Sequence, residues 1–376
     1  MKLSKTNYLI WRECANDAWM KIHRREDYNA IPLSVFDQTI IDQGNEVDEL
    51  ARQVFPGGVT IARGDAKGTA QHVAKRRSVL YQPVFETERF TTACDILVWN
   101  EASGVYDLYE VKGSTSGDDK REKNELYSYD IAFQAEVLKQ NGVPIGRLNV
   151  MRLNREYVRQ GALDPDQLFT REDFSERVAA IAGEVALEMD TAHDVLSSET
   201  PLPSPCTCIE KGRSAHCRTF HITNPDVPEY SVHDIARIGA SKKKLQDLLL
   251  RGILAIEDVP DDFPLNAAQA LQVRVAKTKR AHIDRGAISD FLAAIRYPVS
   301  FLDYETFGAA VPRFDGYGPY SHIPFQYSLD VVASPGADFV HHVFLHTTRD
   351  RPYVAFLTAL LAYLPQHGTI IVLRRM

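Results

Sequence analysis

The stretch that decides the fold is VYDLYEVKG, residues 105–113, which follows the strand-like FTTACDILVWN, residues 90–100, across the turn EASG. Side chains alternate along a strand, so we expect Glu110 and Lys112 on one face of the second strand. The first strand offers Asp95 beside them. Two carboxylates this close repel each other unless a divalent cation lies between them, and hard oxygen ligands suit Mg²⁺ or Mn²⁺. The sequence therefore predicts a metal site in which the Lys112 ammonium orients, or helps to deprotonate, an attacking water.

Composition sets the class of protein. The chain has 376 residues, of which 44% are hydrophobic, which is enough for two or three domains. No apolar run approaches the ~20 residues of a membrane helix, and the polar start MKLSKTN lacks a secretory segment, so we expect a cytoplasmic protein without a membrane partner. The net charge of −7 argues against indiscriminate polyanion binding. Any such affinity must come from local basic groups such as Lys120, Arg121 and Lys123.

Periodicity predicts an α/β arrangement with a mixed sheet in the first part of the chain. Ser4 is a candidate N-cap for the first helix. The expected elements, besides the two strands above, are helices over residues 1–30, 39–54, 126–141 and 166–196, and strands over residues 79–86 and 148–154.

Composition changes divide the chain into three predicted domains. The first spans residues 1–222 and includes the proline-rich break SSETPLPSP near its end. Residues 223–296 alternate short helical runs with turns and predict a helical linker domain. Residues 297–376 return to strand-like segments with one short amphipathic helix, and predict a partial α/β domain.

The order Asp, then Glu-x-Lys, then a Gln on the following helix resembles the RecB-like branch of the PD-(D/E)XK nucleases. The resemblance implies a restriction-endonuclease-like mixed sheet flanked by helices. It also implies metal binding by Asp95 and Glu110, catalysis by Lys112, and substrate or active-site support from Gln134. From the residues alone, the alternative is an ordinary amphipathic hairpin with a surface Glu-x-Lys.

The chain departs from that pattern at several positions. Cys94 stands where the name-giving proline would be and is interpreted as a small buried side chain. Leu138 replaces a Tyr that many members carry. Such nucleases also take an acid or histidine from the first core helix, for which GNEVDELAR offers Glu46, Asp48 and Glu49. We favour Glu49 as a metal ligand, and the alternative for all three is a solvated acidic face.

Four cysteines form one early and three late positions: Cys14, then Cys206, Cys208 and Cys217. This distribution resembles the CRISPR-associated and AddB-type members of the RecB-like nucleases, and it implies a 4Fe-4S cluster. Soft thiolates bind zinc equally well, and His216 keeps a zinc site open as the alternative. In both cases we expect a structural staple that joins the first helix to the end of the first domain.

The segment FLDYETF places Asp303 and Glu305 on one face of a strand. It resembles the opening motif of RNase H-like exonucleases, in which such a pair binds divalent metal ions. The whole chain resembles a bacterial family of unknown function that joins a RecB-like nuclease, through a helical linker, to such a domain. The later acids of this motif are missing unless Asp330 or Asp350 replaces them. Residues 297–376 are therefore expected to be an incomplete, catalytically silent domain.

Taken together, the resemblance implies a Mg²⁺- or Mn²⁺-dependent deoxyribonuclease, expected to be an exonuclease on single-stranded DNA ends in repair or defence. A helicase or other repair protein is a possible partner. The alternative is a non-catalytic nucleic-acid-binding or adaptor protein in which a metal staple supports a degenerate nuclease fold. A zinc-stapled RNA-binding protein is a third hypothesis.

Overall fold

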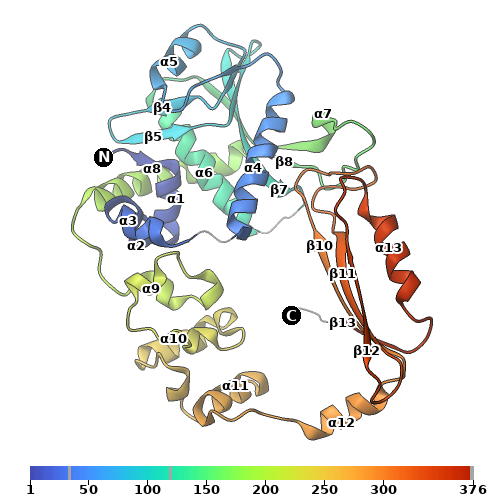
Figure 1. Ribbon diagram of the computed structural model, residues 1–376. Coiled ribbons are helices and arrows are strands. Elements are labelled where there is room, and N and C mark those ends of the chain that lie inside the picture. The colour runs from blue at the N-terminus through green and yellow to red at the C-terminus, as the bar shows by residue number, and fades with distance from the viewer. Residues whose placement is uncertain (33–34, 118–120, 373–376) are drawn as a thin grey trace.

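The structure is a computed structural model that describes residues 1–32, 35–117 and 121–372 of the chain. These residues form an α/β fold of mixed sheets flanked by helices, which confirms the predicted fold class. In Figure 1 the elements follow a ring: the N-terminal part lies at the top, short helices run down the left side, and the last sheet stands on the right. In the described part of the chain, no helix combines the length and the apolar character that crossing a membrane requires.

The central sheet of the N-terminal part has the strand order β2–β3–β6–β7–β8–β9. Strands β6 and β7 form the predicted antiparallel hairpin, while β7 and β8 run parallel. Parallel neighbours need a crossover, which helix α6 (Arg121–Gln140) supplies. The strands are β2 (Val59–Thr60), β3 (Val79–Tyr81), β6 (Ile96–Asn100), β7 (Val105–Thr115), β8 (Ile145–Leu153) and β9 (Phe169–Asp173).

Both faces of this sheet are buried, because successive residues of its strands enter opposite cores. Leu97 packs into the core that holds α6 and α8 (Ser175–Ser197), whereas Ile96 packs into the core under α4 (Val35–Gln53). The period of two residues produces this division. The small helices α5 (Ala66–Ala74) and α7 (Pro165–Leu168) lie at the edges of the same part.

Two predicted strands are each broken into two. The stretch 79–86 splits because Gln82 has a φ of 52° and Pro83 follows it without an N–H to donate. The stretch 90–100 splits at Cys94, so Asp95 lies just before β6 and not inside one long strand. The separated halves join a second sheet with the order β1–β5–β4, made of β1 (Leu3–Ser4), β5 (Phe90–Ala93) and β4 (Val84–Glu86).

The single N-terminal helix predicted over residues 1–30 is wrong. Ser4 caps a helix as expected, accepting a hydrogen bond from the Asn7 N–H at 3.2 Å. The helix ends early, because Cys14 is extended, with φ −160° and ψ 109°. No Pro or Gly marks this break in the sequence. The segment instead forms α1 (Lys5–Glu13), α2 (Ala15–His23) and α3 (Arg25–Ala30).

The helix predicted over 166–196 also starts late, because residues 165–173 form α7 and the edge strand β9 before α8 begins. The middle of the chain is helical, as predicted, and packs its own hydrophobic cluster around Leu245, Leu248 and Val273. Its helices are α9 (Phe220–Thr223), α10 (Lys242–Leu250), α11 (Ala267–Thr278) and α12 (Arg285–Ala294).

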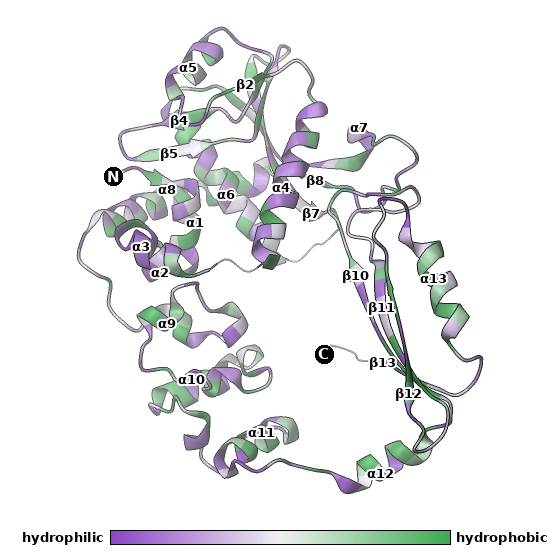
Figure 2. Ribbon diagram, viewed as in Figure 1, coloured by the Kyte–Doolittle hydropathy of each residue, from purple (hydrophilic) through white to green (hydrophobic). Residues whose placement is uncertain are grey.

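The C-terminal part is a mixed sheet with the order β12–β11–β10–β13. Helix α13, largely in the green of hydrophobic residues in Figure 2, packs Phe356 and Leu360 against one face of this sheet. The opposite face is open, and Phe301 and Val343 are 45% and 69% exposed there. The elements are β10 (Val299–Phe307), β11 (Ile323–Val332), β12 (Phe339–Leu345), α13 (Pro352–Tyr363) and β13 (Thr369–Val372).

A loop between β10 and β11, residues 308–322, closes the ring and is called the docking loop below. Its Ala310 and Val311 are each 1% exposed and belong to the core under α4. Arg313 forms a bidentate ion pair with Glu46 at 2.5 and 2.7 Å. The C-terminal part is therefore attached directly to the N-terminal part. The domain limits at residues 222 and 296 stay predictions.

Candidate active site and four-cysteine site

The β6–β7 hairpin brings Asp95 to Glu110. Its register pairs Ile96 with Tyr109, so the preceding residue on one strand lies beside the following residue on the other. The backbone N–H of Val111 donates to Asp95 Oδ2 at 2.8 Å, and Gln82 Nε2 lies 3.3 Å from Asp95 Oδ1. These contacts hold the Asp95 carboxylate against β7.

Glu110 is the centre of the site. It is 2% exposed, and both of its carboxylate oxygens accept hydrogen bonds. Lys112 Nζ lies 2.8 Å from Oε1, and Gln134 Nε2 of α6 lies 2.7 Å from Oε2. The structure thus brings together Asp95, Glu110, Lys112 and Gln134, the four residues that the sequence singled out.

Two further residues complete the site, and sequence reasoning missed both. Asp130 accepts from Lys112 Nζ at 2.6 Å and from Gln134 Nε2 at 2.9 Å. Its signal was available, since residues four apart on a helix share a face. Lys5 Nζ lies 2.8 Å from Glu110 Oε1 and 3.1 Å from Asp130 Oδ1. No local pattern marks Lys5, which is 105 residues from Glu110 in the sequence.

The surroundings of the site shift the pKa values of Asp95 and Glu110 in opposite directions. Burial, and next the negative charge of Glu110, raise the pKa of Asp95 to about 7. Burial also opposes ionisation of Glu110, but the ammonium groups of Lys112 and Lys5 outweigh it and hold the pKa of Glu110 well below its usual range. Burial lowers the pKa of Lys112, but Glu110 and Asp130 more than compensate and raise it. Lys112 is therefore a charged donor at neutral pH.

The donor set fits a hard divalent cation. Gln134 Oε1 is a buried amide oxygen without a hydrogen-bond partner, and it lies on the side chain that contacts Glu110. Burial and the neighbouring charge of Glu110 raise the pKa of Asp95 despite Lys5 and Lys112, and a bound cation would stabilise its charge further. The carboxylate oxygens of Asp95, Glu110 and Asp130 do not, however, lie close enough together to be recognised as a three-acid metal site. Within residues 1–32, 35–117 and 121–372, the four cysteines are the only group of three or more Cys, His, Asp or Glu residues whose ligand atoms gather closely enough for an ion.

Helix α4 does not place Glu49 in the site. Glu49 is exposed, and Glu46 is paired with Arg313 of the docking loop. Asp48 is the acid that faces the centre, because its Oδ1 and the Asp95 Oδ1 both lie 3.3 Å from Gln82 Nε2. Which of Glu46, Asp48 and Glu49 faces the centre depends on the orientation of α4 about its own axis. The sequence motif GNEVDELAR does not determine that orientation.

The local basic groups that follow the site in the sequence are Lys120, Arg121 and Lys123. Lys120 lies outside the described residues, and so do the side chains of Arg121 and Lys123. Leu138, where many of the resembled nucleases carry Tyr, lies on α6 and is fully buried in the core on that side of the sheet.

The four-cysteine site assembles as predicted. The Sγ atoms of Cys14, Cys206, Cys208 and Cys217 all lie within 4.8 Å of one another, so these residues could bind a metal. The extended backbone at Cys14 turns its side chain out of the α1–α2 helices toward the later three. Asn224 Nδ2 donates to Cys206 Sγ at 3.2 Å, the kind of contact that orients a thiolate ligand.

A buried acid supports the four-cysteine site from α2. Asp17 is 6% exposed and accepts from the backbone N–H and hydroxyl of Thr219 at 2.9 and 2.7 Å. Hydrogen bonds from neighbouring sulfurs, that of Cys14 first, lower the pKa of Cys206. Cys94 stays apart, in the core between the sheet and α6, as expected for a small buried side chain.

His216 does not join the cysteines. Its Nε2 donates to the Lys211 carbonyl at 3.0 Å, and its ring stacks on Phe220 with centroids 3.4 Å apart. Burial lowers the pKa of His216 to about 4, so the ring is neutral. A zinc site at this position would accordingly be formed by four cysteines and not by a mixed set.

Asp303 and Glu305 lie on the open face of β10, and both are exposed. Across β11 they face Ser328 and Gln326, which are not acids. Asp330 instead binds His341 Nδ1 at 2.6 Å. Among the described residues no third acid gathers with Asp303 and Glu305.

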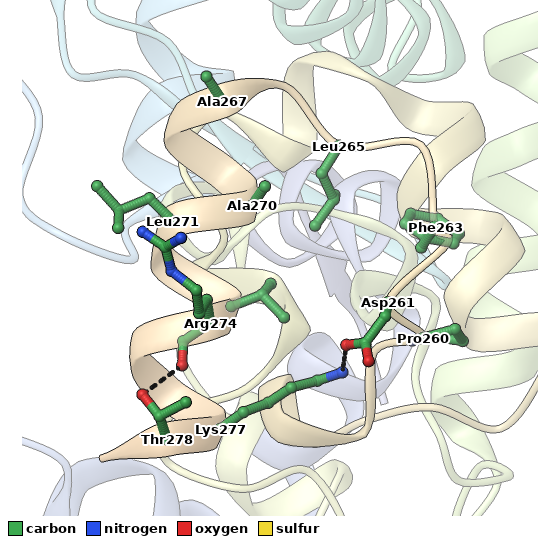
Figure 3. A pocket seen from close by; sticks show the side chains of 11 residues that line it. Pro260, Asp261, Phe263, Leu265, Ala267, Ala270, Leu271, Arg274, Lys277 and Thr278 are labelled. Carbon is green, nitrogen blue, oxygen red and sulfur yellow. Dashed lines mark hydrogen bonds and ion pairs between the residues drawn. The ribbon is translucent and has the colours of Figure 1, made fainter. Parts of the chain in front are cut away.

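One pocket lies far from every predicted site residue. It has a volume of about 670 Å³ and lies beside α11, where Figure 3 shows Lys277 reaching Asp261. That ion pair, at 2.5 Å, occupies the only charged groups of the pocket other than Arg274. We assign no chemistry to it.

A family described as a domain of unknown function (DUF2779) matches residues 300–375, which correspond to the C-terminal sheet and α13. No curated protein matches the chain. The N-terminal part, with the centre around Glu110 and the four-cysteine site, lies outside the matched region.

Proposed function

We propose that the chain is a divalent-metal-dependent nuclease that hydrolyses DNA phosphodiester bonds with Asp95, Glu110, Lys112 and Gln134. One observation carries the proposal: residues from a hairpin and from the next helix converge, so that Lys112 and Gln134 both contact Glu110 beside Asp95. An ordinary surface Glu-x-Lys hairpin would leave Glu110 exposed, whereas here it is 2% exposed.

Each side chain has a role that follows from its contacts. Asp95 and Glu110 would hold Mg²⁺ or Mn²⁺, which when bound polarises the phosphate and stabilises developing negative charge. Gln134 fixes the rotamer of Glu110 by binding Oε2. Lys112, charged and anchored to Asp130, orients the attacking water and does not remove its proton. Exonuclease action on single-stranded ends, and a helicase partner, are supported by the family resemblance alone.

For the four-cysteine site we infer one tetrahedral Zn²⁺ in preference to a 4Fe-4S cluster. Zn–S bonds of ~2.3 Å give a sulfur–sulfur edge of about 3.8 Å. Cys206 Sγ and Cys217 Sγ are 3.9 Å apart. In a four-iron cluster each thiolate lies outside its own iron, so every edge is longer by the whole iron–iron separation. The four Sγ atoms all lie within 4.8 Å of one another, so the longest edge exceeds the zinc edge by about 1 Å at most. An iron–iron separation of that size would be shorter than a carbon–carbon bond of ~1.5 Å, so the site is too small for a four-iron cluster.

A non-catalytic nucleic-acid-binding or adaptor protein is the alternative, and one observation favours it. Lys5 and Lys112 already neutralise Glu110. Within the described ranges, Asp95, Glu110 and Asp130 do not bring their carboxylate oxygens close enough together to form a three-acid metal site. A degenerate centre held together by ion pairs has this appearance.

Degradation of labelled single-stranded DNA separates the two functions. We expect the wild-type protein to degrade it only with Mg²⁺ or Mn²⁺, and Lys112→Ala to be slower by about 100-fold, because it loses the water-orienting charge. Lys139→Ala is the matched control, since this lysine is 77% exposed on α6. Equal rates for wild type and Lys112→Ala would remove the proposed centre.

A further inference from the structure

Lys5 holds an unusual position for a cation. It is the first residue of α1, where the helix dipole opposes positive charge, and its side chain is only 18% exposed. Its Nζ lies 2.8 Å from Glu110 Oε1 and 3.1 Å from Asp130 Oδ1, so two buried carboxylates hold it in place. Burying a charged group is energetically unfavourable, so we infer that the Lys5 charge has a role in the site.

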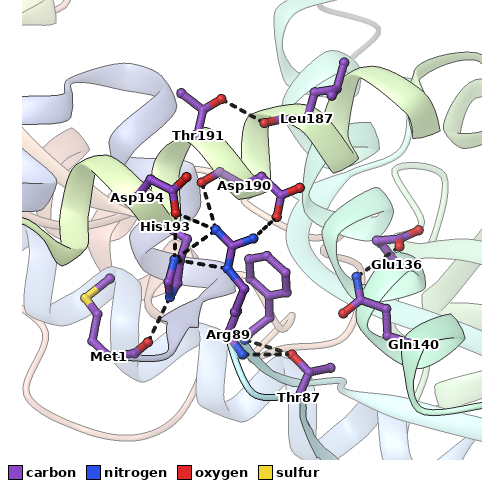
Figure 4. A network of polar contacts seen from close by, with 11 residues as sticks. Met1, Thr87, Arg89, Glu136, Gln140, Leu187, Asp190, Thr191, His193 and Asp194 are labelled. Atoms are coloured by element: carbon purple, nitrogen blue, oxygen red, sulfur yellow. Dashed lines mark hydrogen bonds and ion pairs between the residues drawn. The ribbon is translucent and has the colours of Figure 1, made fainter.

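The N-terminal segment is built to place Lys5. Strand β1 pairs Leu3 with Phe90, and the Leu3 N–H donates to the Arg89 carbonyl at 2.8 Å. Figure 4 shows His193 of α8 reaching both Arg89 and the Met1 carbonyl, the latter at 3.1 Å from Nε2. The segment before Lys5 is thus fixed at both of its ends.

Charge balance identifies what Lys5 is for. When all three are ionised, as metal binding requires, Asp95, Glu110 and Asp130 carry three negative charges, against which Lys5 and Lys112 set two positive ones. The further acid, Asp48, is paired with Arg52. A bound dication converts the remaining negative charge into a single positive charge, which matches one phosphodiester group. Without Lys5 the loaded centre would be neutral and would have no net attraction for a phosphate.

We propose that Lys5 is a substrate-binding residue of this centre: it bridges Glu110 and Asp130, and it would contact a phosphate oxygen of DNA when Asp95 and Glu110 hold a divalent ion. The proposal rests on the nuclease function proposed above. It requires two opposite effects of the Lys5 charge, since this charge repels a metal ion and attracts a phosphate.

The test measures the two affinities separately with the full chain. Mn²⁺ binding is followed by the electron paramagnetic resonance of the free ion, and DNA binding by the anisotropy of a fluorescein-labelled thymidine oligonucleotide in saturating Ca²⁺. We expect Lys5→Met to bind Mn²⁺ about tenfold more tightly and the oligonucleotide about tenfold more weakly. Lys2→Met is the matched control, because Lys2 is 41% exposed and pairs with Glu86 outside the centre.

A second variant separates charge from structure. Lys5→Gln keeps a hydrogen-bond donor toward Glu110 but has no charge, so we expect it to behave as Lys5→Met does. Wild-type affinities in Lys5→Gln, or weaker binding of Mn²⁺ in both variants, would overturn the proposal. Asp95→Asn tests the underlying function: if it binds Mn²⁺ as well as the wild type does, the metal site itself is wrong, whatever Lys5 does.

Discussion

At the scale of single residues, the candidate centre depends on how buried charges are matched. Glu110 and Asp130 are 2% and 3% exposed, and Lys5, Lys112 and Gln134 all donate to them. Charged groups this deep are stable only when each finds partners. The sequence predicted Glu110 and Lys112, because their spacing is local. It could not predict Lys5, because only the tertiary fold brings the N-terminal segment to β7.

Gln134 offers a prediction at this scale. Gln134→Met removes the amide that donates to Glu110 and Asp130, leaving two buried carboxylates each short of one hydrogen bond. We expect the free energy of unfolding to fall by about 1–3 kcal/mol, measured by urea denaturation. Gln140→Met, an exposed position on the same helix, should change it by less than about 0.5 kcal/mol. Equal stability of Gln134→Met and wild type would show that the amide is not needed.

At the scale of elements, breaks in regular structure position the site residues. Cys94 ends β5 and lets Asp95 precede β6, and Cys14 ends α1 and turns toward the later cysteines. The apolar pattern runs through both breaks, so it predicted one strand where there are two and one helix where there are three. These breaks are determined by partners distant in sequence, a second sheet for β5 and the four-cysteine site for α1. Element order and the hairpin were predictable because they depend on local periodicity.

The four-cysteine site gives the second prediction. Purified wild-type protein should contain one Zn²⁺ per chain by mass spectrometry of metals and should be colourless. Cys217→Ser should lose the metal, because a hydroxyl is a poor substitute for a soft thiolate. It should also lower the melting temperature, since the staple joins α2 to the loop of residues 206–217.

The matched control for this prediction is Cys94→Ala, a cysteine buried outside the site that should keep the metal. A brown protein with about four irons per chain would contradict the zinc assignment and restore the cluster. Retention of zinc in Cys217→Ser would remove Cys217 from the ligand set.

At the scale of the whole molecule, the docking loop (residues 308–322) joins the C-terminal part to the N-terminal part. Arg313 binds Glu46 of α4, and Tyr320 OH donates to the Gly113 carbonyl at 2.5 Å, directly after Lys112 on β7. The C-terminal part therefore touches two elements that carry the candidate centre. Contacts between residues more than two hundred positions apart leave no local pattern, so the sequence alone predicted a separate C-terminal domain.

Val311 tests that attachment. Val311→Asp places a carboxylate at a position that is 1% exposed in the hydrophobic core under α4, where burial of a charge is costly. We expect the C-terminal part to detach and the radius of gyration from small-angle X-ray scattering to increase. Val340→Asp is the control, because Val340 is 57% exposed on β12. An unchanged radius in Val311→Asp would show that the loop is not what holds the ring closed.

The central claim is that Asp95 and Glu110 form a metal-dependent hydrolytic centre, and one measurement tests it most directly. It is the rate of Mn²⁺-dependent cleavage of single-stranded DNA by Glu110→Gln, with Glu101→Gln in the exposed hairpin turn as the control. Glu110→Gln keeps the shape of the side chain but removes the charge, so we predict a loss of about 100-fold or more, with Glu101→Gln at the wild-type rate. Cleavage by Glu110→Gln at the wild-type rate would contradict the claim.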